Sequence, residues 1–197
     1  MSNWPDDGDR QLVVFRHAYT KKGEVRGQGS HLSSEGVALA RRIGARLGSF
    51  DRVYVSLEPR TMETALAMGF AVDAALAFSC GYVPGEFEHH AQWDWQSPFV
   101  RFAELIRAGG QLSATVAADR ALWDRLVSAV SPGGRVLILS HGGTIEPVLV
   151  ACLPEANHAL WGAPFSHGDG VVLTHRGGRF VDAVFMRVGT DEGSLSK

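Results

Sequence analysis

The sequence predicts an α/β protein whose functional residues gather at one edge of a sheet. Residues 12–15 (LVVF) and 135–139 (RVLIL) are short apolar runs, a pattern typical of strands that are covered on both faces. His17 lies just beyond the first run and His141 just beyond the second. Ligands of open α/β sheets bind where strands end, so we expect both histidines at one ligand-binding edge.

Length and charge exclude several classes of protein. A chain of 197 residues can bury a proper core, and we expect a single domain over residues 1–197. The net charge of −2 offers no broad basic surface, so we expect no nucleic-acid or membrane partner. Residues 1–10 are polar, unlike a signal peptide, and no apolar run reaches membrane-spanning length, which predicts a cytoplasmic protein. The sequence contains no exposed apolar stripe from which to infer an oligomeric state.

Helical and extended patterns alternate through the first half of the chain. Ser33 or Ser34 is expected to cap the first helix, and Glu35 in its first turn suits the positive end of the helix dipole. Pro59 fits the first turn of the second helix. In order, the patterns predict a helix to about residue 47, a strand at 52–56, a helix at 60–69 and a strand at 71–78.

The regular patterns break down between about residues 80 and 112. Such a stretch predicts an insertion that packs over one end of the sheet and caps the active site, as lids and specificity loops do. A helix around 99–108 is expected within it. The remaining patterns predict helices at 116–130 and 144–152 and strands at 135–139, 170–174 and 180–185.

Arg60 occupies the first turn of its predicted helix, where the helix dipole disfavours a cation. An anion bound beside the helix would explain this position. Pairing of Arg60 with Glu58 or Glu63 would explain it equally well, so position alone leaves both interpretations open.

Arg16, His17, Arg60 and His141 form a set that suits phosphoryl transfer. Planar guanidinium groups match phosphate oxygens, and negative charge spreads over those oxygens during the reaction. One histidine must be neutral to attack phosphorus, whereas the second can stay cationic and hold an oxygen. A carboxylic acid is also needed to protonate the leaving oxygen.

Four motifs in order resemble the histidine phosphatase superfamily, branch 1, which includes the cofactor-dependent phosphoglycerate mutases. They are LVVFRHA at residues 12–18, Leu32-Ser33-x-x-Gly36, Val55-Ser56 with Arg60-x-x-Glu63-Thr64-Ala65, and Ser140-His141-Gly142-Gly143. The resemblance implies a three-layer α/β/α sandwich with a mostly parallel sheet and no requirement for a metal or other cofactor. It implies that His17 is the phosphorylated nucleophile. The residues that would bind the phosphoryl group are Arg16, Arg60 and His141.

Further substrate contacts are expected from Arg26, in the glycine-rich loop after the first strand, and from Gly142. The sequence departs from the family pattern at two positions, one after His17 and one after His141. Ala18 replaces the glycine that usually follows the nucleophile, as it also does in small phosphohistidine phosphatases. Glu146 stands where many members carry a basic or neutral residue.

The proton donor is the least defined part of the predicted site. In the mutase-like branch the donor is a glutamate of the insertion, which makes Glu86 the first candidate and Glu88 the second, with Asp94 third. We expect at least two of these three to be solvated loop acids. A metal site at His89 and His90 is disfavoured, because adjacent residues rarely form a good pair of ligands.

We expect a metal-independent phosphatase that acts on a small phosphomonoester and releases inorganic phosphate. A mutase is disfavoured because the insertion adds only Arg101 and Arg107 to the basic groups near the site. A family member that binds a phosphorylated ligand without turnover, and a phosphohistidine phosphatase with an open pocket, are the alternatives. The other histidines are expected to be structural or exposed, although His167 precedes a strand and could line the rim of the site.

Overall fold

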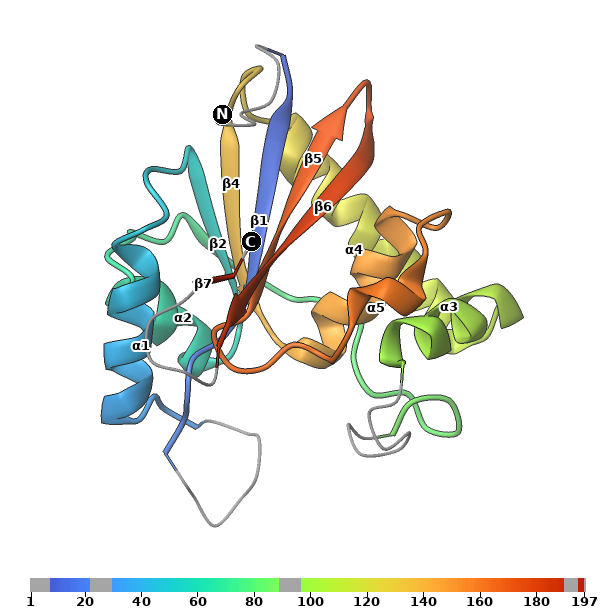
Figure 1. Ribbon diagram of the computed structural model, residues 1–197, viewed down its shortest axis with the longest axis horizontal. Helices are drawn as coiled ribbons and strands as arrows, with labels where there is room; N and C mark the ends of the chain where they lie inside the picture. The colour runs from blue at the N-terminus through green and yellow to red at the C-terminus, as the bar shows by residue number, and fades with distance from the viewer. Residues whose placement is uncertain (1–7, 22–29, 89–96, 190–194, 197) are drawn as a thin grey trace.

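The computed structural model describes residues 8–21, 30–88, 97–189 and 195–196 and shows a central sheet with helices on both faces (Figure 1). The strands are β1 (Arg10–Arg16), β2 (Arg52–Ser56), β3 (Ala74–Leu76), β4 (Arg135–Ser140), β5 (Gly170–Arg176), β6 (Arg179–Val188) and β7 (Leu195–Ser196). Their order in the sheet is β3-β2-β4-β1-β5-β6-β7. This arrangement confirms the predicted α/β/α sandwich, whereas a single domain over the whole chain stays a prediction.

The sheet has a parallel part and an antiparallel part. Strands β3, β2, β4 and β1 run parallel to one another, in agreement with the predicted mostly parallel sheet. Beyond β1, the strands β5, β6 and β7 each pair antiparallel with their neighbour. The start of β5 therefore lies at the same edge as the end of β1, where the predicted site residues are.

Helices cover the sheet in two groups (Figure 1). They are α1 (Ser34–Gly44), α2 (Pro59–Ala67), α3 (Pro98–Ala108), α4 (Gln111–Ser128) and α5 (Gly142–Cys152), with a short 3-10 helix at His158–Trp161. Side chains alternate along β1, so that Val13 and Phe15 join the core with α1 and α2. Leu12 and Val14 join the core with α3, α4 and α5 on the opposite face. Both faces of β1 are thus fully buried, as its continuous apolar run predicts.

The start of α1 is fixed against the loop that follows β1. Ser33, one of the two predicted caps, accepts a hydrogen bond from the Gly36 N–H at 3.1 Å. A Cβ atom at Gly36 would come within 2.0 Å of the Tyr19 carbonyl oxygen. Only glycine allows this close approach, which holds the segment after His17 against the helix.

Helix α4 begins at Gln111, five residues before the predicted start at residue 116. The reason is a capping group that comes from elsewhere in the chain. The carboxylate of Glu86 accepts hydrogen bonds from the backbone N–H groups of Gln111 at 2.7 Å and Leu112 at 3.0 Å. The sequence around residue 111 contains no local cap that would reveal this start.

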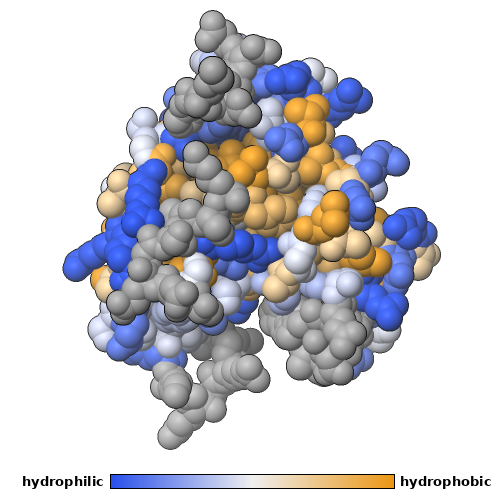
Figure 2. Space-filling view, viewed as in Figure 1, coloured by the Kyte–Doolittle hydropathy of each residue, from blue (hydrophilic) through white to orange (hydrophobic). Residues whose placement is uncertain are grey.

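One face of the molecule carries apolar side chains over its middle and hydrophilic ones around them (Figure 2). Across the described parts of the chain, no helix combines the length and the apolar character that spanning a membrane requires.

Candidate active site

The register between β1 and β4 brings the two predicted catalytic histidines together. Arg16 at the end of β1 is the register partner of Ser140 at the end of β4. A histidine directly follows the end of each strand, and the ring centroids of His17 and His141 lie 5.3 Å apart. The predicted meeting of these two side chains at one sheet edge follows from this parallel pairing.

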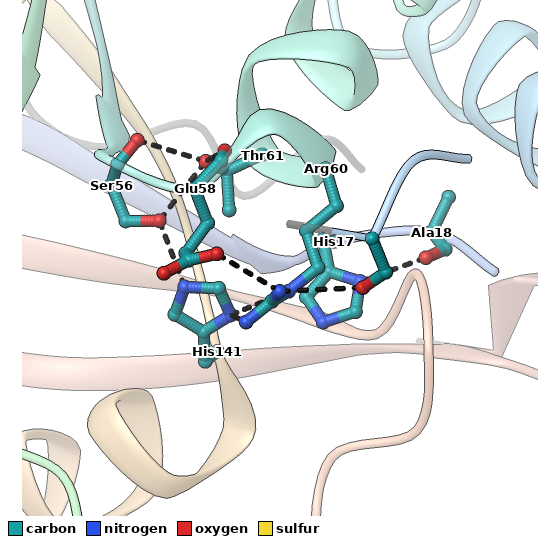
Figure 3. A network of polar contacts seen from close by, with 8 residues as sticks. His17, Ala18, Ser56, Glu58, Arg60, Thr61 and His141 are labelled. Atoms are coloured by element: carbon teal, nitrogen blue, oxygen red, sulfur yellow. Dashed lines mark hydrogen bonds and ion pairs between the residues drawn. The ribbon is translucent and has the colours of Figure 1, made fainter. Parts of the chain in front are cut away.

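His17 is held as a neutral imidazole with a defined tautomer. Its Nδ1 donates a hydrogen bond to the Ala18 carbonyl oxygen at 2.8 Å, so Nε2 carries the free lone pair (Figure 3). Burial lowers the pKa of His17 to about 2, and the nearby His141 and Arg16 act in the same direction. The backbone N–H of His17 donates to the Ser140 carbonyl, which ties His17 to β4.

Arg60 enters the site from the first turn of α2. Its Nε and Nη2 each lie 3.4 Å from Nδ1 of His141, and its Nη1 lies 3.2 Å from the carboxylate of Glu58 (Figure 3). Arg60 therefore pairs with Glu58, as one of the two interpretations predicts, and also faces the edge where His17 and His141 meet. An anion bound beside Arg60 stays a prediction. Glu63 does not serve as this partner: it hydrogen-bonds His31 and the Leu32 N–H instead.

The surroundings of His141 favour a neutral ring, although the sequence analysis allowed this histidine to stay cationic. Because the guanidinium of Arg60 can only donate, Nδ1 of His141 accepts, and Nε2 donates to Ser56 Oγ at 2.8 Å. Burial lowers the pKa of His141 to about 3, with Arg60 adding to the effect. Gly142 follows as the first residue of α5, so the positive end of that helix also faces this edge.

Arg16 is anchored from behind the site. Its Nη1 donates to the Phe165 carbonyl oxygen at 2.5 Å. Burial lowers the pKa of Arg16, whereas the negative charge of Glu146 opposes this effect.

The start of the predicted insertion contacts the first turn of α5, at the same edge of the sheet. The carbonyl oxygen of Cys80 accepts a hydrogen bond from Thr144 Oγ1 in the first turn of α5, at 2.9 Å. Residues 89–96 lie outside the described residues, so a cap over the site stays a prediction.

His167 is a site residue that the sequence analysis identified only as a rim candidate. Its ring centroid lies 5.2 Å from that of His17 and 5.2 Å from that of Tyr19. Burial lowers the pKa of His167 to about 4, with Arg16 and Arg60 adding to the effect. The sequence alone does not reveal that β5 pairs beside β1. This pairing brings the turn before β5, which contains His167, to His17.

The two predicted proton donors that the structure describes, Glu86 and Glu88, both accept hydrogen bonds from the backbone of their own surroundings. Glu86 caps α4, a role the sequence did not reveal, and both of its carboxylate oxygens accept backbone hydrogen bonds there. Glu88 is exposed and accepts from the Gly85 N–H at 2.9 Å. Asp94 and the predicted substrate ligand Arg26 both lie outside the described residues.

Within the described residues, no group of three or more His, Cys, Asp and Glu side chains is arranged to hold a metal ion. The donors that face the site are instead arginine N–H groups and a helix N-terminus. These groups bind anions, and arginine in particular matches the oxygens of a phosphoryl group.

The fold and this edge define an α/β protein with a candidate anion site beside His17. A family model, the histidine phosphatase superfamily (branch 1), matches residues 12–185, and the chain belongs to this family. Curated proteins, by contrast, include no match to the chain.

Solved structures with the same fold include phosphatases and a mutase. A mycobacterial glucosyl-3-phosphoglycerate phosphatase is 24% identical, with a TM-score of 0.59 over 90% of this chain and 97% of that one. A phosphoserine phosphatase from Entamoeba histolytica, in complex with 3-phosphoglyceric acid, is 17% identical, with a TM-score of 0.62 over 91% and 98%. A phosphoglycerate mutase from Bacillus anthracis is 19% identical, with a TM-score of 0.61 over 91% and 94%.

Proposed function

We propose that this protein is a metal-independent phosphatase that hydrolyses a small phosphomonoester through a phosphohistidine on His17. The observation that carries the proposal is the state of His17. Its Nδ1 is engaged by the Ala18 carbonyl, and its low pKa leaves Nε2 unprotonated and nucleophilic at neutral pH. Membership of the histidine phosphatase superfamily supports this assignment.

The reaction proceeds in two displacements at phosphorus. In the first, Nε2 of His17 forms a bond to phosphorus while the ester P–O bond breaks, and the leaving oxygen takes a proton from an acid. In the second, water attacks the phosphohistidine, the N–P bond breaks, and inorganic phosphate leaves as the acid recovers its proton. Arg16, Arg60 and the N–H groups of α5 stabilise the charge that spreads over the phosphoryl oxygens.

We assign the proton donor to the insertion, with Glu88 preferred over Glu86. Both oxygens of Glu86 already accept hydrogen bonds from the start of α4, and its use as an acid would weaken that cap. Glu88 has an exposed side chain in the same segment. Asp94 is the third candidate.

The substrate class we propose is a small phosphorylated metabolite. One structural relative, the phosphoserine phosphatase from Entamoeba histolytica, supports this class through two solved complexes, one with phosphoserine and one with 3-phosphoglyceric acid. The ring of His167 contacts His17 on one side and Tyr19 on another, and we assign to His167 a hydrogen bond to the substrate.

The proposal is tested by hydrolysis of p-nitrophenyl phosphate with EDTA present. The wild type is expected to turn over and His17→Ala to be inactive, while His158→Ala, which changes a histidine bonded to the Leu153 carbonyl, keeps the wild-type rate. Rapid acid-free quenching with a labelled substrate is expected to trap label on the wild type, in an acid-labile and alkali-stable bond.

Other outcomes separate the alternatives. Turnover by His17→Ala at the wild-type rate would exclude the phosphohistidine mechanism. An inactive wild type that still binds vanadate would identify a binding protein without catalysis. Transfer of the phosphoryl group to an acceptor other than water would identify a mutase.

A further inference from the structure

We propose that Glu146, a buried acid of α5, is a positioning residue that holds Arg16 in place through the peptide group of Phe165. This inference rests on the proposed function, in which Arg16 binds the phosphoryl group. Glu146 has no part in the two displacements described above.

The hydrogen bonds form a continuous chain from Glu146 to Arg16. Glu146 Oε1 accepts from the Phe165 backbone N–H at 2.7 Å. The carbonyl oxygen of the same residue, Phe165, accepts from Arg16 Nη1 at 2.5 Å. The carboxylate thus fixes the segment that supplies the acceptor for the guanidinium.

Burial makes this connection costly to lose. Glu146 is 0% exposed, and neither its Oε2 nor Nε of Arg16 has a hydrogen-bond partner within the described residues. A buried carboxylate that holds only one hydrogen bond destabilises the fold, because it has lost its hydration. Its presence at this position therefore favours a role other than stability. The charge of Glu146 is also the largest influence that opposes the effect of burial on the pKa of Arg16.

Other charged groups around Glu146 do not provide this link. Arg187 and Asp169 influence the pKa of Glu146, but they bond to each other at 3.1 Å. Arg187 further stacks on the Phe165 ring, with its guanidinium carbon 4.7 Å from the ring centroid. This pair contacts the Phe165 ring and also holds the neighbouring backbone, because Arg187 donates to the Pro164 carbonyl and Asp169 accepts from the Ser166 N–H. Glu146 is the acceptor for the N–H of Phe165 itself.

The test is a double-mutant cycle read out as the dissociation constant of orthovanadate. Glu146→Leu removes the acceptor and keeps the volume, and Glu146→Gln keeps an acceptor and removes the charge. Because Leu loses the hydrogen bond to Phe165, we expect it to weaken binding about tenfold with Arg16 present and less than about twofold in an Arg16→Ala background. Gln is expected to restore binding to within about threefold of the wild type.

Asp9 provides the matched control. It is a buried acid beside the opposite end of β1, where its carboxylate is bonded to Arg176. We expect Asp9→Ala to change the vanadate dissociation constant less than about twofold, with or without Arg16. Glu146→Ala replaces Glu146→Leu in the cycle if the leucine variant does not fold.

Three results would overturn the inference. The first is an equal effect of Glu146→Leu with and without Arg16, and the second is a Gln variant that binds as weakly as the Leu variant. In both cases the proposed function stands, because Arg16→Ala alone still weakens binding. The third is an Arg16→Ala variant that binds vanadate like the wild type, which would overturn the phosphoryl-binding role of Arg16 together with this inference.

Discussion

Ser56 Oγ lies 2.8 Å from Nε2 of His141 and accepts the proton of that ring. Ser56 ends β2, and His141 follows β4, so this bond joins neighbouring strands at the catalytic edge. It selects the tautomer in which Nδ1 of His141 faces the guanidinium of Arg60. The side chain of Ser56 therefore orients the ring of His141, which in turn faces Arg60, a group that we propose binds the phosphoryl oxygens.

Removal of this hydroxyl is expected to reduce catalysis without unfolding the protein. Ser56→Ala leaves the Nε2 proton of a buried ring without its acceptor, and we expect kcat/KM for p-nitrophenyl phosphate to fall about tenfold. Thr115→Ala, which removes a hydroxyl bonded within α4, is the control and should keep the wild-type value. An unchanged kcat/KM for Ser56→Ala would show that the tautomer of His141 does not matter.

Substitution of Glu86 is expected to affect stability more than chemistry. Glu86→Ala removes the acceptor for two backbone N–H groups at the start of α4, so its free energy of unfolding should fall by about 1 kcal/mol in urea titrations. With an alkyl phosphate, whose leaving oxygen needs protonation, Glu88→Gln should lower kcat more than Glu86→Gln does. Native stability combined with slow turnover of the alkyl phosphate in Glu86→Gln would instead identify Glu86 as the donor.

The neutral histidines predict a loss of stability in acid. The folded-state pKa values of His17 and His141, about 2 and about 3, lie below the usual value of 6.5. Between these values only the unfolded chain binds the protons, so the stabilisation is complete above pH 6.5 and declines as the pH falls. We expect the two histidines to account for about 3 kcal/mol of unfolding free energy lost between pH 6.5 and pH 5.

A variant with asparagine at both positions isolates this contribution. Its unfolding free energy should fall with acid by about 3 kcal/mol less than that of the wild type over the same range. Parallel curves for the two proteins would contradict the burial of neutral imidazoles.

Glu146 predicts the opposite dependence. Burial raises the pKa of Glu146 to about 7 from the usual 4.5, so the folded protein binds a proton that the unfolded chain has released. This stabilisation is complete below about pH 4.5 and is lost as the pH rises through 7. The glutamine of Glu146→Gln cannot ionise. Between pH 5 and pH 8 the unfolding free energy of this variant should therefore rise by on the order of 2 kcal/mol relative to that of the wild type. A constant difference between the two curves would show that Glu146 has an ordinary pKa.

The parts of the site that could be predicted from sequence depend on local signals. The apolar runs before His17 and His141 predict strands, and strand ends in one sheet are where such groups meet. The position of Arg60 predicted a partner or an anion, and the fold supplies Glu58 as the partner beside the catalytic edge.

The parts that could not be predicted depend on contacts between distant segments. His167 reaches the site because β5 pairs with β1, and strand order is not written in the sequence of either strand. The capping role of Glu86 requires α4 to begin beside a residue 25 positions earlier in the chain. The low pKa of His141 depends on its burial between segments, and its tautomer depends on hydrogen bonds with Ser56 and Arg60, which come from other elements.

The place of β1 in the sheet also has a consequence for biosynthesis. This strand is the first to leave the ribosome, yet its two neighbours are β4, more than 120 residues later, and β5, later still. A nascent chain therefore presents the segment LVVF without a partner until translation has passed residue 140, and pairings of such long separation form slowly. We therefore expect the edge at which His17 and His141 meet to be incomplete until the chain has been made through β4.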